Sequence, residues 1–149
     1  MSKLFRIVYC SRSLLTGSRA EIEVAIRQIL ATARRNNRAA HLTGALAFTD
    51  NCFAQVLEGS LEDLAPVFAR IRHDPRHTDL KILEQTSPES RAFSRWSMAF
   101  VDTPDSGGDH PLAHFSFEAA LADGAGPEAE QVLHALRRLV IAKSKVIAA

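Results

Sequence analysis

The 149-residue chain lacks several features that mark specialised classes of protein. Its two cysteines, Cys10 and Cys52, are too few for a disulfide framework and do not have the spacing of metal ligands. Its apolar runs are far shorter than the roughly 20 residues of a membrane-spanning helix, and its N-terminus lacks the apolar stretch of a signal peptide. The 18 basic and 17 acidic side chains leave a formal charge of only +1. We therefore expect a soluble cytoplasmic protein that binds neither nucleic acid nor a membrane.

Common catalytic and metal-binding motifs are absent as well. The sequence contains no Gly-x-Gly-x-x-Gly or P-loop motif, no His-Glu-x-x-His motif and no Gly-x-Ser-x-Gly elbow. His73 and His77 have the spacing of a helical ligand pair, but Pro75 between them interrupts a continuous helical face. We accordingly expect no metal site.

The first hundred residues show a regular alternation of strand-like and helix-like patterns. Strand patterns are found at 4–10, 42–49, 52–59, 79–85 and 93–101. A capping box formed by Ser18 and Glu21 predicts a helix that ends near residues 36–37, and a second helix starts at residue 60. This order predicts an α+β fold, a ferredoxin-like β-α-β-β-α-β core with an added fifth strand. Right-handed crossovers then place both helices on one face of the sheet.

The composition changes after residue 102. The stretch 103–111 is rich in proline and glycine, and helical patterns follow at 116–122 and 128–146. We expect one domain at 1–102, and at 103–149 a linker and helical extension that covers the free sheet face. Because this extension is amphipathic, we also expect a homodimer or a higher homo-oligomer.

Three kinds of polar residue fall where packing alone favours apolar side chains. Gln55 lies in an apolar row of its strand, Tyr9 points to the same sheet face by strand parity, and Asn36 or Asn37 lies on the apolar stripe of the first helix. Each has an ordinary explanation: a helix-capping Asn, an exposed strand Gln, or a Tyr with its hydroxyl in water. Together, their carboxamides supply the donors and acceptors that recognise the edge of a planar heterocycle such as a flavin or a pyrimidine.

Six sequence blocks occur in an order and spacing that suggest a known family. They are RIVYCS at 6–11, RNN at 35–37, LTGAL at 42–46, FAQVLEG at 53–59, DPRH at 74–77 and FSRWSM at 93–98. Over residues 3–102 the chain resembles the BLUF domains, blue-light sensors that use FAD. The whole chain resembles the short BLUF proteins, which carry a helical C-terminal extension and no output enzyme.

The resemblance implies a flavin (FAD, with FMN possible) held non-covalently between the two helices. By this resemblance Tyr9 is the light-driven electron donor and Gln55 the switching amide between it and the flavin. Trp96 and Met98 on the fifth strand pass the signal through the C-terminal helices to an unidentified downstream signalling protein. The positions that match flavin-binding residues are Asn36, Asn37, Gln55, Ile29, Phe53, Arg70, Ile71, Asp74 and His77, with Arg76 in the same block as the last two. The resemblance implies a sensor and not an enzyme.

Two alternatives share the fold. An acylphosphatase-like enzyme would need an arginine in a phosphate-binding loop and an asparagine that positions water, for which Arg12 and Asn36 are the candidates. A ferredoxin-like interaction domain without a chromophore would give a colourless protein. One departure from the family pattern is Ala33, which stands where many members have a hydroxyl side chain.

Overall fold

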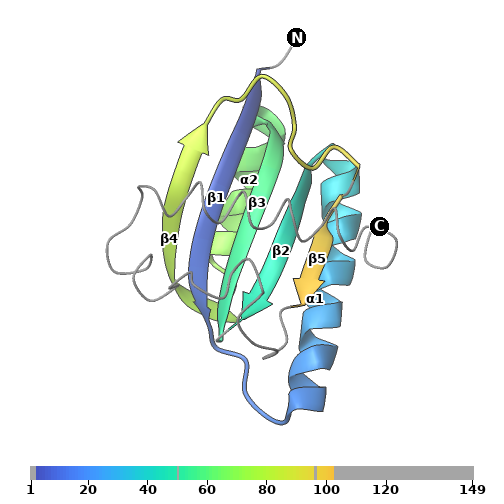
Figure 1. The fold of residues 1–149 in the computed structure, drawn as a ribbon, viewed down its shortest axis with the longest axis vertical. Coiled ribbons are helices and arrows are strands. Elements are labelled where there is room, and N and C mark those ends of the chain that lie inside the picture. Colours follow the sequence, from blue (N-terminus) through green and yellow to red (C-terminus); the bar gives the residue numbers. More distant parts are fainter. Residues whose placement is uncertain (1–2, 50, 96, 103–149) are drawn as a thin grey trace, which may run out of the picture.

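The computed structural model describes residues 3–49, 51–95 and 97–102, so the expected extension at 103–149 and the side chain of Trp96 lie outside it. The described part contains, in chain order, β1 (Leu4–Ser13), α1 (Arg19–Ala39), β2 (Thr43–Thr49), β3 (Cys52–Ser60), α2 (Leu61–Arg72), β4 (His77–Thr86) and β5 (Ala99–Asp102) (Figure 1). The predicted ferredoxin-like core with an added strand is confirmed.

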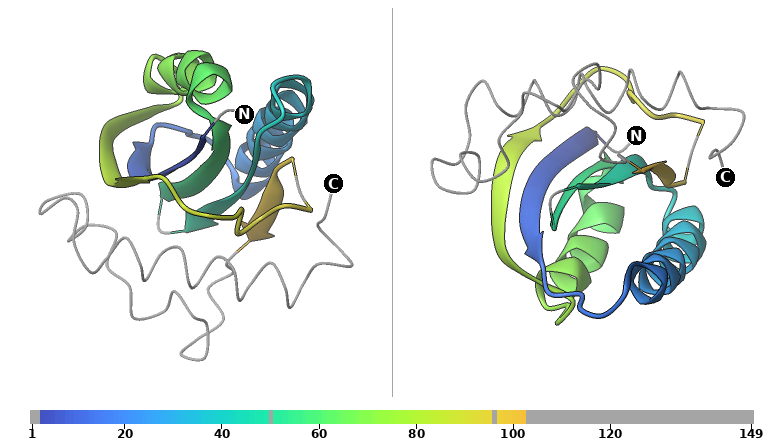
Figure 2. Two further views of the ribbon diagram at one scale, coloured as in Figure 1. Left: turned by 90° about the horizontal axis from the view of Figure 1, so that it is seen from above. Right: turned by 60° about the horizontal axis from the view of Figure 1, so that its bottom comes forward.

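The five strands form one sheet in the order β4-β1-β3-β2-β5. β5 pairs in parallel with β2, whereas the other neighbouring strands are antiparallel. Both helices lie on the same face of the sheet, as Figure 2 shows from above and from below. The main apolar core therefore lies between this face and the helices, and includes Ile7, Leu30, Leu57, Leu64 and Phe68.

The first helix begins as predicted and ends later. The side chain of Ser18 accepts from the backbone N–H of Glu21, and the Glu21 carboxylate accepts from the backbone N–H of Ser18, which completes the capping box. The helix continues to Ala39, past the predicted end near 36–37. His41, with φ of 57°, is the residue that takes the left-handed conformation after it. The explanation of the two asparagines as capping residues is therefore wrong.

The pairing of β1 with β3 sets the geometry of the centre of the sheet. Tyr9 lies directly opposite Gln55, so their side chains project to the same face. On the other side of β3, β2 approaches so closely that a Cβ atom on Gly44 would lie 2.0 Å from the carbonyl oxygen of Val56. Glycine is therefore required at this position for the β2–β3 pairing.

The predicted fifth strand, 93–101, is only partly correct. β5 starts at Ala99, and the residues before it have no strand partner among the described residues. The backbone N–H of Phe93 instead bonds to the buried Glu58 carboxylate, and Asn37 bonds to the carbonyl oxygen of Ser97. Because side chains satisfy these backbone groups, the segment needs no neighbouring strand.

Candidate functional site

A cavity of about 230 Å³ lies between the helix-bearing face of the sheet and the two helices. Every residue that the family resemblance assigned to the flavin lines it, together with Tyr9. The complete lining is Tyr9, Ile29, Thr32, Ala33, Asn36, Asn37, Leu46, Phe53, Gln55, Val67, Arg70, Ile71, Asp74, Arg76 and His77. The fold thus brings together residues that are up to 68 positions apart in the sequence, although their individual roles stay predictions.

Tyr9 and Gln55 are joined by a buried hydrogen bond at the sheet side of the cavity. The Tyr9 hydroxyl donates to Oε1 of Gln55, and both side chains are almost completely buried. The phenol ring packs against Phe68 and His77 at centroid distances of 5.8 and 6.2 Å. Burial raises the pKa of the Tyr9 hydroxyl far above its ordinary value, and the negative charge of Asp74 adds to this effect. The phenol is therefore neutral at physiological pH.

The other end of the Gln55 carboxamide faces Met98. Nε2 of Gln55 lies 3.6 Å from Sδ of Met98, which is fully buried. A thioether sulfur is a weak acceptor, so this N–H group keeps most of its capacity to donate to a stronger one. The predicted signalling residue Met98 is in direct contact with the predicted switching amide. Trp96 lies outside the described residues.

The end of α1 contributes two carboxamides to the cavity. Asn37 is buried, and its Nδ2 donates to the carbonyl oxygen of Ser97 at 2.7 Å. Asn36 is half-buried and also lines the cavity. Among the described residues, the hydroxyl of Ser97 is the one buried side-chain polar atom that has no hydrogen-bond partner. Side chains that can form hydrogen bonds are therefore concentrated where α1 meets the residues before β5.

Charged and aromatic groups occupy the opposite end of the cavity. The Arg76 guanidinium donates to both oxygens of Asp74, with Nε 2.9 Å from Oδ1, and this holds the pKa of the carboxyl below its usual value. The same contact raises the pKa of Arg76. The His77 ring bonds to the Ser11 hydroxyl through Nδ1 and to the Ile71 carbonyl oxygen through Nε2, both at 2.6 Å. Because a carbonyl oxygen only accepts, Nε2 carries the proton in the second bond.

Three lining residues were not predicted from the sequence: Thr32, Leu46 and Val67. Helical spacing could have found Thr32, which lies three residues after Ile29 and four before Asn36. Leu46 is directly opposite Gln55 in the β2–β3 register, which only a correct pairing reveals.

The donor set fits a flavin. A planar ring with adjacent carbonyl and N–H groups needs carboxamides at its edge and apolar walls on its faces, and Asn37, Gln55, Ile29 and Phe53 supply both. The described residues contain no group of three or more His, Cys, Asp or Glu side chains that could hold a metal ion. In the same part of the chain, no helix is both long and apolar enough to cross a membrane.

A family model described as "Sensors of blue-light using FAD" matches residues 4–99. The chain belongs to the BLUF family. The prediction made from the six sequence blocks is confirmed. Family members are flavin-binding blue-light sensors.

Individual relatives agree with this assignment. The photoactivated adenylate cyclase subunit beta of Euglena longa is 31% identical over 98 residues, which are 65% of this chain and 11% of the relative. The antirepressor BluF of Escherichia coli, described as blue light- and temperature-regulated, is 31% identical over 77 residues, or 52% of this chain and 19% of that protein. The chain thus spans between about a tenth and a fifth of the length of these relatives.

Solved structures of similar length resemble the chain over most of its residues. The structure of BlsA in its ground state has a TM-score of 0.74 at 26% identity. The matched region is 90% of this chain and 87% of the BlsA chain. The dark-state structure of the BLUF protein BlrB has a TM-score of 0.73 at 25% identity, with 93% and 98% covered.

Proposed function

We propose that this chain is a blue-light receptor in which Tyr9 and Gln55 are the photoactive pair. The observation that supports the proposal most directly is the buried Tyr9–Gln55 hydrogen bond at the wall of a cavity that is lined by flavin-compatible side chains. Membership of the BLUF family supports the same assignment.

The cofactor of this proposal is FAD, with FMN as the alternative. Asn36 and Asn37 hold the polar edge of the ring, and Ile29, Phe53 and Ile71 form its apolar walls. The part of the cavity beside Arg70, Asp74 and His77 takes the ribityl and phosphate end. When bound, the flavin supplies absorption of blue light and a strongly oxidising excited state.

In the primary step Tyr9 would give an electron and a proton to the bound flavin. Its raised pKa keeps the phenol protonated in the dark, and removal of an electron makes that phenol strongly acidic, so the proton leaves with the electron. Oε1 of Gln55 already accepts the hydrogen bond along which that proton leaves. When electron and proton return, the Gln55 carboxamide would have rotated or tautomerised, and it would donate more strongly to the ring. Tyr9 is then again a neutral phenol, and no covalent bond joins the flavin to the protein.

The rearranged hydrogen bonds carry the signal. A change of one or two buried hydrogen bonds is worth a few kcal/mol, which biases an element between two arrangements but does not unfold a domain. Met98 is the described residue that contacts the Gln55 Nε2 group, so the residues before β5 are the first element to respond. The signal then passes through β5, Trp96 and residues 103–149 to a downstream protein. In this proposal the chain acts in the cytoplasm as a homo-oligomer and turns over no substrate.

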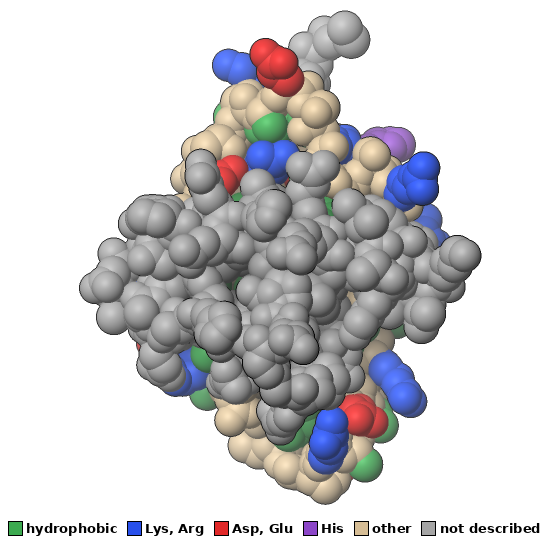
Figure 3. Space-filling view, viewed as in Figure 1, with side chains coloured by type: hydrophobic (Ala, Val, Ile, Leu, Met, Phe, Trp, Pro, Cys, Tyr) green, Lys and Arg blue, Asp and Glu red, His purple; other side chains and the backbone are tan. Residues whose placement is uncertain are grey.

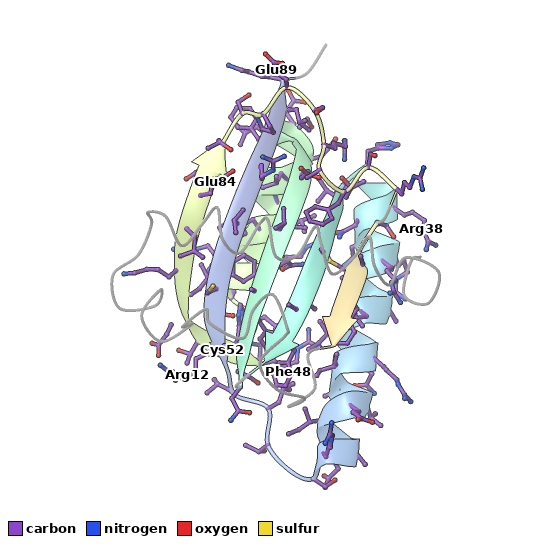
Figure 4. The ribbon with its side chains drawn as sticks, in the orientation of Figure 1. Arg12, Arg38, Phe48, Cys52, Glu84 and Glu89 are labelled. Atoms are coloured by element: carbon purple, nitrogen blue, oxygen red, sulfur yellow. The ribbon has the colours of Figure 1, made fainter. Side chains whose placement is uncertain are left out.

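The acylphosphatase-like alternative is not favoured by the geometry. Arg12 lies at the end of β1, where its Nε is 3.4 Å from Oδ2 of Asp79, and it does not line the cavity that contains Asn36 (Figure 4). The two residues that a phosphate-hydrolysing site would need are therefore not part of one site.

Absorption spectroscopy of the purified full-length chain tests the proposal. We expect a yellow protein whose flavin band shifts reversibly to longer wavelength under blue light and returns in the dark. Mass spectrometry of the flavin released by denaturation distinguishes FAD from FMN. A colourless protein that takes up neither flavin would support the chromophore-free interaction domain, and a yellow protein with no light-induced shift would refute the receptor function.

A further inference from the structure

The segment between β4 and β5 is held in place by side chains from other elements. Within 92–98, backbone N–H groups of Ala92 and Phe93 bond to Glu58, and backbone carbonyl oxygens of Ser97 and Met98 bond to α1. Strand-to-strand hydrogen bonds break cooperatively, whereas bonds made by separate side chains break one at a time. This segment can therefore shift without disrupting the sheet.

The start of the segment is fixed at Glu58 on β3. The Glu58 side chain is fully buried, and its carboxylate accepts hydrogen bonds from Nε and Nη2 of Arg6 at 3.0 and 2.9 Å. It also accepts from the backbone N–H groups of Ala92 at 2.8 Å and Phe93 at 2.9 Å. A buried carboxylate is tolerated only when it is paired and its oxygens are hydrogen-bonded, and these four donors meet that requirement. This end of the segment is a rigid anchor.

The other end is held by α1. Asn37 donates to the carbonyl oxygen of Ser97, and Nε of Arg34 donates to the carbonyl oxygen of Met98 at 3.0 Å. The Met98 side chain in turn lies against the Gln55 carboxamide. Arg34 is partly buried and does not line the cavity, so it acts on Gln55 through Met98.

We propose that Arg34 is a positioning residue that holds Met98 against Gln55 and thereby sets how fast the light-induced state returns to the dark state. The inference rests on the proposed photoreceptor function and adds a residue outside the flavin cavity to it. In this proposal the arrangement that Arg34 stabilises is that of the dark state, and dark recovery is the return to it. Loss of the Arg34 contact therefore slows recovery.

The chain offers a matched control on the same helix. Arg35 is the next residue, it is exposed, and no hydrogen bond or ion pair of its side chain is formed within the described residues. Figure 4 labels Arg38 beside the end of α1, and Figure 3 shows Lys and Arg side chains on this side of the molecule as well as elsewhere on its rim. Substitution of Arg35 changes the charge of this region by the same amount as substitution of Arg34 but leaves the Met98 carbonyl contact intact.

The experiment measures dark recovery of the flavin-loaded full-length chain after a blue-light pulse. We expect Arg34→Met, which removes the donor, to bind flavin and to show the red shift, but to recover at least about fivefold more slowly, a factor set below that of a fully buried charged hydrogen bond because the site is partly exposed. Arg34→Lys, which keeps a charged donor, and Arg35→Met should recover within about twofold of the wild type. Arg34→Leu also lacks a donor and replaces the Met variant if that one does not fold.

Two further measurements separate positioning from a general loss of stability. In a Met98→Ala background, Arg34→Met should no longer change the recovery rate, because the side chain through which Arg34 acts is missing. In the flavin-free chain, Arg34→Met should speed amide hydrogen exchange in Ala99–Asp102 and leave β4 unchanged.

The outcomes distinguish this inference from the function on which it rests. A wild-type protein without a red shift would refute the receptor function and the inference with it. If the wild type has a normal photocycle but Arg34→Met slows recovery less than about fivefold, the inference alone is overturned. The same holds if the full effect of Arg34→Met persists in the Met98→Ala background.

Discussion

Replacement of Tyr9 by phenylalanine removes one hydroxyl group and changes little else. The ring contacts with Phe68 and His77 are retained, and the side chain stays within the same apolar row. What is lost is the donor to Oε1 of Gln55, a buried acceptor with 4% of its residue surface exposed. The variant therefore isolates a single hydrogen bond at the centre of the proposed site.

The loss has a structural and a photochemical consequence. A buried acceptor that loses its donor destabilises the fold by about 1–3 kcal/mol. For a chain of this size, a loss of about 2 kcal/mol lowers the Tm by about 4–8 °C. The cavity walls are unchanged, so we expect Tyr9→Phe to bind flavin and remain yellow. Because the variant has no oxidisable phenol at this position, we expect the light-induced red shift to be abolished.

Difference spectra under blue light and urea unfolding of the same preparations test both consequences. A double-mutant cycle with Gln55→Leu measures the bond itself: each single variant leaves one buried polar group without a partner, whereas the double variant leaves none. We expect the double variant to be more stable than the sum of the two single losses by about 1 kcal/mol or more. A red shift of normal size in Tyr9→Phe would rule out Tyr9 as the electron donor, and additive stabilities would show that the hydrogen bond contributes nothing.

Two further predictions concern the strand pairing and the acidic end of the cavity. Gly44→Ala should reduce the free energy of unfolding by about 3 kcal/mol or more in urea titration, because the added Cβ would clash with the Val56 carbonyl oxygen. Gly59→Ala is the control: its added Cβ would come closest to the end of the Leu42 side chain, which can move, so the loss of stability should be smaller. The Arg76 contact lowers the pKa of Asp74 in the folded state, so its stabilisation is complete above the unfolded value near 4 and is lost as the pH falls through the lower folded value. The free energy of unfolding of Asp74→Asn should therefore depend less on pH below about pH 4 than that of the wild type. The same pH dependence in both proteins would contradict this.

The sequence was informative where the hydrophobic period was regular. Strand parity placed Tyr9 and Gln55 on the same face, and the helical stripe placed Asn36 or Asn37 on the side of α1 that faces the sheet. The order of elements then left one space between helices and sheet in which these residues meet. Strand parity could not predict that Tyr9 and Gln55 lie directly opposite each other. That register depends on the pairing of β1 with β3, two strands that no turn connects directly.

The residues before β5 show why the remainder could not be predicted. Residues 93–101 were predicted to form a strand, and Phe93 and Met98 in this stretch are fully buried. A strand is defined by its partner, however, and here a single buried carboxylate at Glu58 replaces the partner for Ala92 and Phe93. In the sequence, Glu58 alternates with the apolar residues of β3 and has the pattern of a solvent-facing position. The burial of Glu58 follows only from the three-dimensional packing of residues 92–93, which are distant from it in the sequence. The same packing fixes one end of the segment before β5, whereas the other end, at Met98, is held by Arg34.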